Sequence, residues 1–239
     1  VRCNRMTDRS VALVTGTSRG VGRGIAEHFL EQGYEVIGCS RSQFSLPAEK
    51  YEHAVVDVGE DEQVRQWIRG VARSYGRIDV VVNNAGIGPA SLALLTSTAL
   101  VDSTLRTNFL GTFSVCREAA KVMLKRRFGR IINISSIAVA LHMTGASAYV
   151  ASKSAMVEFS KVLAKELGPT GITCNVIALS LLETDMMADL NEEAMERYMQ
   201  SLAIKRRAEM EDVCNVVSFF ASPASGYITG QVIHLGFVD

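Results

Sequence analysis

The chain has 239 residues, of which 48% are hydrophobic and 21% are charged. That composition can bury a sizeable core, which excludes a globally disordered chain. The 25 basic and 25 acidic side chains cancel, so the net charge gives no electrostatic footprint for nucleic acid or an anionic membrane.

The cysteines and histidines are scattered along the chain. None of the five cysteines forms a CxxC pair and the four histidines have no metal-ligand spacing, so we expect neither a disulfide framework nor a metal site. Reduced thiols are typical of the cytoplasm. No apolar run reaches the roughly 18 residues that span a bilayer. Residues 1–9 have no signal-peptide core, and we expect them to form a tail in which Met6 is a candidate start.

Short hydrophobic runs alternate with helical patterns from Ser10 onward. Near-continuous hydrophobic runs are typical of strands buried in a parallel sheet. Seven runs fit this description: Val11–Thr15, Glu35–Cys39, His53–Val58, Asp79–Val82, Arg130–Ser135, Ile172–Ala178 and Gln231–Leu235. Apolar spacing and the stop signals at Gly33 and Gly168-Pro169 predict the helices between them. These are Val21–Phe29, Asp61–Tyr75, Ala99–Phe128, Tyr149–Leu167 and Met210–Ala221.

The alternation of strands and helices predicts an α/β protein. We expect residues 10–239 to form one doubly wound Rossmann domain, with about seven parallel strands and helices on both faces of the sheet. Residues 181–202 are rich in Met, Glu and Leu. They predict an inserted pair of short helices, which would form a lid above the strand ends.

A glycine-rich turn joins the first strand to the first helix. Gly16, Gly20 and Gly22 give the backbone the close approach and free N–H groups that a phosphate needs at a helix N-terminus. Glycines also simply make turns, but this cluster opens the first βα unit of an alternating chain. The position therefore predicts nucleotide binding.

The T-G-x-x-x-G-x-G spacing from Thr15 to Gly22 resembles the classical short-chain dehydrogenase/reductase family, and the resemblance runs from Ser10 to Asp239. Further motifs match in order: Asp57-Val58, Asn83-Asn84-Ala85-Gly86, Asn108, and Ser136 with Tyr149-x-x-x-Lys153. The motif spelling is most similar to 3-oxoacyl-[acyl-carrier-protein] reductases. The resemblance implies cofactor contacts from Gly16, Ser18, Arg19, Gly20, Val21, Gly22, Arg41, Asp57, Val58, Asn84, Ala85, Gly86, Tyr149, Lys153, Leu182 and Thr184.

The end of the second strand distinguishes NAD from NADP. An acidic residue there binds the ribose hydroxyls and repels a 2′-phosphate. This sequence has Cys39-Ser40-Arg41 instead, without a carboxylate. Arg41 and Arg19 can bind the phosphate through their guanidinium groups, although surface arginines are common for other reasons. We expect NADP(H) as the cofactor.

Tyr149 and Lys153 lie one helical turn apart and project on one face. A lysine ammonium favours the phenolate and lowers the pKa of a tyrosine from about 10. Tyr149 would then be the general acid in reduction and the general base in oxidation. The resemblance implies that Lys153 binds the nicotinamide ribose, that Ser136 holds the substrate oxygen, and that Asn108 keeps a water beside Lys153. Each residue taken alone also has an ordinary structural explanation.

Two segments depart from the family pattern. The sequence Asn175-Val-Ile-Ala-Leu179-Ser180 replaces the usual Asn-x-x-x-Pro-Gly turn below the nicotinamide. A left-handed Ser180 would cost about 1–2 kcal/mol. Near the C-terminus, Ile233–Phe237 replaces the usual valine-aspartate-glycine-glycine ending, which changes contacts that often pair subunits.

The residues expected around the substrate are mostly apolar, which favours hydrophobic ketones or acyl chains over sugars. They are Ile137, Leu141, His142, Met143, Leu179, Leu182, Met186 and Met187. Carrier-protein docking in the resembling reductases uses two basic positions. Lys125–Arg127 supplies one, and Thr170 stands at the other. The resemblance also implies a homodimer or homotetramer, formed through the helices at Ala99–Phe128 and Tyr149–Leu167.

Three functions follow from these patterns. The first is an NADPH-dependent enzyme that reduces a ketone or 3-oxoacyl carbonyl to a hydroxyl by hydride transfer. The second is an alcohol, sugar or steroid dehydrogenase with the same chemistry. The third is a non-catalytic NADP(H)-binding protein, which the altered Leu179-Ser180 turn would favour and the Ser136–Tyr149–Lys153 set opposes.

Overall fold

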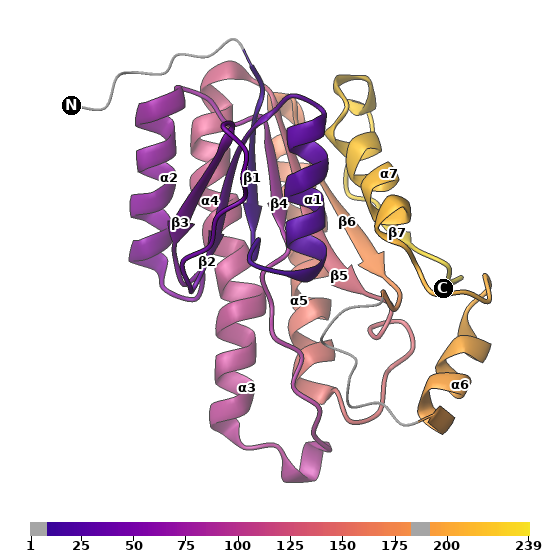
Figure 1. The fold of residues 1–239 in the computed structure, drawn as a ribbon. Coiled ribbons are helices and arrows are strands. Elements are labelled where there is room, and N and C mark those ends of the chain that lie inside the picture. Colours follow the sequence, from indigo (N-terminus) through magenta and orange to yellow (C-terminus); the bar gives the residue numbers. More distant parts are fainter. Residues whose placement is uncertain (1–8, 183–191) are drawn as a thin grey trace.

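A computed structural model describes residues 9–182 and 192–239 (Figure 1). Seven parallel strands form one sheet in the order β3-β2-β1-β4-β5-β6-β7. The strands are β1 (Val11–Thr15), β2 (Glu35–Ser40), β3 (Tyr51–Val55), β4 (Val80–Asn83), β5 (Gly129–Ser136), β6 (Ile172–Leu179) and β7 (Val232–His234). The predicted doubly wound parallel sheet is confirmed, with β1 and β4 side by side where the strand order reverses.

Helices cover both faces of the sheet, as the sequence predicts (Figure 1). They are α1 (Gly20–Glu31), α2 (Asp61–Tyr75), α3 (Thr98–Leu105), α4 (Gly111–Met123), α5 (Ser147–Leu167), α6 (Glu192–Ser201) and α7 (Met210–Ala221). Buried side chains of α2, α4 and α5 form the core on one face. Those of α1 and α7 form the core on the other, so the hydrophobic strands are buried on both sides.

The helix predicted over Ala99–Phe128 is confirmed as a continuous helical run, but its hydrogen bonding changes along its length. The chain forms α3, then a π-helical turn over Arg106–Leu110, then α4 and a 3-10 turn over Leu124–Arg126. A π-helical turn inserts one residue into the hydrogen-bond ladder and leaves little trace in the apolar pattern.

The third strand begins and ends earlier than predicted. The apolar run extends to Val58, but pairing with β2 stops at Val55. Val56 donates one further backbone hydrogen bond to the Ser40 carbonyl (2.9 Å), and Val56 and Val58 are both buried against the core beyond the end of the strand. Hydrophobicity therefore marks burial here and not strand pairing.

The segment around Ser180 carries no left-handed backbone. Among the described residues other than glycine, only Arg127 (φ 52°) and His142 (φ 46°) have positive φ. Ser180 is buried just beyond β6, which continues to Leu179. The strain expected for a left-handed Ser180 does not arise, because the strand continues where the family pattern makes a turn.

The predicted lid is described in part. Within residues 181–202 the structure places one helix, α6, whose Tyr198 packs together with Leu202, the residue after the helix, against Ile137 and Ala178. The second helix of the predicted pair falls on residues 183–191, outside the described residues, together with Thr184, Met186 and Met187.

Candidate active site

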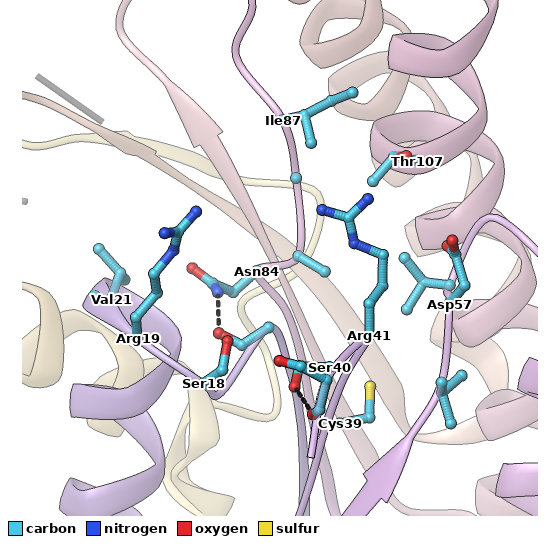
Figure 2. Close-up of a pocket in the computed structure, with 17 residues that line it drawn as sticks. Ser18, Arg19, Val21, Cys39, Ser40, Arg41, Asp57, Asn84, Ile87 and Thr107 are labelled. Atoms are coloured by element: carbon cyan, nitrogen blue, oxygen red, sulfur yellow. Dashed lines mark hydrogen bonds between the residues drawn. The ribbon is translucent and has the colours of Figure 1, made fainter. Parts of the chain in front are cut away.

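A pocket of about 680 Å³ lies at the carboxyl ends of β1, β2 and β4, beside the point where the strand order reverses (Figure 2). Ligands of open α/β sheets bind at this place. Its lining includes predicted cofactor residues: Gly16, Ser18, Arg19, Gly20, Val21, Arg41, Asp57, Val58, Asn84, Ala85 and Gly86. The other lining residues, which were not predicted as cofactor contacts, are Cys39, Ser40, Ser42, Val56, Ile87 and Thr107.

The glycine-rich turn is packed too closely for side chains. A Cβ atom on Gly22 would lie 2.3 Å from the carbonyl oxygen of Gly16 and 2.4 Å from Nδ2 of Asn84. Nδ2 of Asn84 donates a hydrogen bond to the Thr15 carbonyl (3.0 Å), and Oγ1 of Thr15 accepts one from the backbone N–H of Ala85 (3.0 Å). Gly22 thus supports the turn from behind, and Asn84 fixes it to the loop after β4.

Two cationic side chains border the pocket. Arg19 and Arg41 are exposed, and Figure 2 shows them on either side of Asn84. Within the described part of the chain, neither makes an ion pair or side-chain hydrogen bond. The Cys39 carbonyl accepts the N–H of Gly16 (2.8 Å), which holds the end of β2 against the glycine turn. Exposed guanidinium groups beside a glycine turn fit a dinucleotide with an additional phosphate.

Three of the predicted catalytic residues come together above β5. The hydroxyl groups of Tyr149 and Ser136 are hydrogen bonded, and Oγ of Ser136 also accepts the N–H of Ala138 (3.1 Å). Nζ of Lys153 lies 5.9 Å from the centroid of the Tyr149 ring. The neighbouring Ser135 is buried without a partner for its hydroxyl among the described residues, so the geometry favours Ser136 as the reactive serine.

Lys153 connects this set to the pocket. Its side chain is buried, and Nζ donates a hydrogen bond to the Ile134 carbonyl (2.7 Å). A Cβ atom on Gly86, which lines the pocket, would lie only 3.5 Å from Nζ of Lys153. A group that occupies the pocket near Gly86 would therefore lie beside the Lys153 ammonium.

The expected lowering of the Tyr149 pKa is not found. Burial raises the pKa of Tyr149, and the hydrogen bond from Ser136 opposes this rise. Burial also lowers the pKa of Lys153 to about 8. Desolvation of the buried phenol is the largest effect on the pKa of Tyr149, and Lys153 is not among the groups that shift it, which accounts for the difference from the expectation.

Asn108 lies in the π-helical turn and is completely buried. Its Oδ1 accepts the N–H of Ile87 (2.8 Å), while Nδ2 donates to the Ile87 carbonyl (2.8 Å) and to Oγ of Ser152 (2.9 Å). The side chain therefore joins the loop after β4 to α5. Its role in holding a water beside Lys153 stays a prediction.

The predicted substrate residues that the structure describes lie outside the 680 Å³ pocket. Ile137 has no exposed surface, and Leu141 and Met143 pack around it and against α6. Leu179 and Leu182 belong to the core on the α1 and α7 side. His142 is exposed in a left-handed turn. Their contacts with a substrate stay predictions.

The described residues also limit the kinds of site. They include no group of three His, Cys, Asp or Glu side chains able to hold a metal ion. None of the described helices is long and apolar enough to cross a membrane.

The fold and this site define a dinucleotide-dependent oxidoreductase: a glycine turn at the strand-order switch, two exposed arginines, and a Ser–Tyr–Lys set beside them. Comparison with known proteins supports the same class of enzyme. The family model described as enoyl-(acyl carrier protein) reductase matches residues 16–236. The chain belongs to the short-chain dehydrogenase/reductase family.

Individual relatives are similar over nearly their whole length. The chain is 37% identical to the 3-oxoacyl-[acyl-carrier-protein] reductase FabG of Aquifex aeolicus, over 94% of this chain and 95% of the relative. It is 35% identical to FabG of Haemophilus influenzae, over 94% of this chain and 96% of the relative. Two solved structures, each 29% identical, have the same fold. ElxO with NADP bound has a TM-score of 0.88 and covers 95% of this chain and 97% of its own. A point variant of actinorhodin polyketide ketoreductase with NADPH has a TM-score of 0.86, and the match covers 95% of this chain and 96% of the ketoreductase chain.

Proposed function

We propose that this chain is an NADPH-dependent reductase that converts the carbonyl of a ketone or 3-oxoacyl thioester to a hydroxyl. The observation that carries the proposal is the Ser136–Tyr149–Lys153 set next to the glycine-lined pocket. Bound NADPH would supply the hydride. The relatives named as 3-oxoacyl-[acyl-carrier-protein] reductases and the NADPH-bound ketoreductase support this choice.

The chain's own residues would divide the remaining work. The Ser136 hydroxyl would hold the carbonyl oxygen of the substrate at the Tyr149 hydroxyl, which donates the proton as that oxygen gains charge. Because burial raises the pKa of Tyr149, the phenol is protonated at neutral pH, and donation of its proton depends on stabilisation of the phenolate that forms. Protonated Lys153 would then stabilise the phenolate left on Tyr149.

The substrate class follows from the apolar surroundings. Leu141 and Met143, with the buried Tyr198 of α6, form a hydrophobic cluster near the end of β5. An acyl chain fits such a surface better than a sugar. Lys125, Arg126 and Arg127 are exposed beyond α4, but Thr170 adds no second cation, so we propose recognition of the acyl thioester itself.

A substrate panel tests this function. NADPH absorbance would be followed while simple ketones, sugars, steroid ketones, 3-oxoacyl thioesters on a small thiol, and the same acyl groups on a carrier protein are added. We expect turnover with the small thioesters. Turnover restricted to sugars or steroids would contradict the proposal, and NADPH binding without turnover of any member would indicate a non-catalytic protein.

The buried lysine predicts the pH dependence of reduction. Since the pKa of Lys153 is lowered to about 8, its ammonium is present below that pH and is lost as the pH rises through it. We expect kcat/KM for carbonyl reduction to fall above about pH 8, because the pH profile of kcat/KM reports groups of the free enzyme. In Lys153→Arg the side chain stays charged, so this decline should disappear, whatever the variant's absolute rate. A wild-type profile that stays flat to about pH 10, the ordinary range for a lysine, would contradict the assignment.

Assembly and location are proposed from the exposed apolar side chains and the thiols. We propose a homodimer or homotetramer formed through α4 and α5, since these helices and the turns beside them expose Leu110, Leu124 and Val162. Light scattering on the purified protein would measure the state. A cytoplasmic location is supported by the free thiols of Cys39, Cys116, Cys174 and Cys214.

A further inference from the structure

A chain of side-chain hydrogen bonds runs behind the pocket. Oγ1 of Thr17, in the glycine turn, lies 2.8 Å from the hydroxyl of Tyr51, which lies 2.8 Å from Nδ1 of His53. Nε2 of His53 lies 3.1 Å from both the Ser42 carbonyl and Oγ of Ser40. The chain thus begins at one loop that borders the pocket and ends at another, with β3 between them.

The sequence makes room for this arrangement at Gly38 in β2. A Cβ atom at this position would lie 2.3 Å from the Tyr51 hydroxyl and 2.5 Å from Oγ1 of Thr17. Gly38 has no unusual φ, so space is the reason for a glycine. Phe44 covers the outer side, with its ring centroid 5.7 Å from that of His53. The site is built around these hydroxyl and imidazole groups.

The partners determine which nitrogen of His53 carries the proton. The Ser42 carbonyl can only accept, so Nε2 must donate. Nδ1 then accepts from the Tyr51 hydroxyl, which accepts in turn from Thr17. Burial lowers the pKa of His53, in agreement with a neutral ring. With this tautomer the Nε2 proton is shared between the Ser42 carbonyl and Oγ of Ser40, and the chain of hydrogen bonds has one direction.

The loop at the end of this chain carries Arg41. Ser40, Arg41 and Ser42 all line the pocket, and Oγ of Ser40 donates to the Ser42 carbonyl (2.8 Å). Ser40 is the last residue of β2, and the Ser42 carbonyl beyond it accepts hydrogen bonds from Ser40 and from His53, which together hold the segment that carries Arg41. No described residue makes a hydrogen bond or ion pair with the Arg41 side chain. The backbone position of Arg41 therefore determines which points its guanidinium group can reach.

We propose that His53 is a positioning residue that sets the preference for the phosphorylated dinucleotide. It fixes the Ser40–Ser42 loop relative to the glycine turn, so that Arg41 meets the 2′-phosphate while the turn holds the pyrophosphate. The proposal rests on the proposed use of NADPH. His53 itself touches no cofactor atom in this scheme, since it is not among the residues that line the pocket.

The test measures affinity for NADPH and for NADH in the His53→Leu variant, by fluorescence or calorimetry and without any substrate. Loss of a hydrogen bond that aims Arg41 should lower the NADPH-to-NADH affinity ratio about fivefold, the equivalent of roughly 1 kcal/mol. His53→Gln, which has both an amide donor and an acceptor, should restore most of the ratio. Equal losses for both dinucleotides in His53→Leu would overturn the proposal.

Three further variants complete the design. His28→Leu is the matched control, because His28 is another partly buried histidine whose Nε2 bonds a serine hydroxyl, Ser218 (2.7 Å), away from the pocket. It should leave the ratio unchanged, and a change as large as that of His53→Leu would count against the proposal. Tyr51→Phe interrupts the chain while keeping the ring and should also lower the ratio. If His53→Leu fails to fold, a normal ratio in folded Tyr51→Phe would overturn the proposal.

Arg41→Ala separates this inference from the choice of cofactor. It should lower the ratio at least as much as His53→Leu, because it removes the charge that the loop presents. An unchanged ratio in Arg41→Ala would show that Arg41 does not bind the 2′-phosphate and would overturn the positioning proposal, whereas a wild-type ratio near one would contradict the NADPH assignment itself. A lowered ratio in Arg41→Ala with a normal one in His53→Leu would reject the positioning role alone.

Discussion

The Tyr149→Phe variant should lose about 10²–10⁴-fold in kcat for carbonyl reduction, the usual contribution of a general acid. The phenyl ring fills the same space beside Lys153 and Ser136, so the fold should remain. NADPH affinity should change much less than kcat, because the lost group acts on the substrate oxygen. Single-turnover oxidation of NADPH, followed by absorbance, measures the effect at the chemical step.

Tyr227 provides the control for this experiment. It is fully exposed at 102% relative accessibility, so Tyr227→Phe removes a hydroxyl without touching the pocket or the core. Its kcat should equal that of the wild type. A Tyr149→Phe enzyme that keeps its kcat within about tenfold of the wild type would exclude Tyr149 as the main proton donor.

The Gly22→Ala variant should lose dinucleotide binding. The added methyl group would lie 2.3 Å from the Gly16 carbonyl oxygen, so the glycine turn must move away from α1. Overpacking of this kind costs about 1–3 kcal/mol of stability. A displacement of about 1 Å in such a turn can cost about 100-fold in function, and we expect a loss of that order in NADPH affinity.

Gly70 in α2 is the matched position for this change. A Cβ atom there meets nothing within 4 Å, and its φ is that of an ordinary helix. Gly70→Ala should therefore raise the free energy of unfolding by up to about 1 kcal/mol and leave NADPH affinity unchanged. Calorimetry of both variants tests the contrast. Wild-type NADPH affinity in Gly22→Ala would mean that the turn does not bind the cofactor.

The sequence predicts much of the fold because most strands are buried on both faces. Val11–Thr15 is hydrophobic throughout and pairs on both edges, so the run and the strand coincide. The run His53–Val58 misleads because Val56 and Val58 are buried beyond the end of the strand. Helix ends at Gly33 and before Gly168 were predictable from glycine and proline chemistry, and the structure agrees.

The site was predictable where residues lie close in sequence and less so elsewhere. The turn of helix between Tyr149 and Lys153 follows from their spacing. The amide of Asn84 could not be placed from sequence, and its bonds to Thr15 and Gly16 give it a supporting role in the glycine turn. No sequence pattern indicated a role for the His53 side chain. Its role depends on partners from three different segments, which only the folded chain brings together.

The π-helical turn at Arg106–Leu110 has a consequence for how this region can vary. One additional residue rotates everything after it by about 100° around the helix axis. Accordingly, α3 packs mainly against α5, whereas α4 packs mainly against α2. The two parts of this helical run, α3 and α4, therefore contact different neighbouring helices. Substitutions on the packed face of α3 should therefore act mainly on α5, and those on the packed face of α4 mainly on α2.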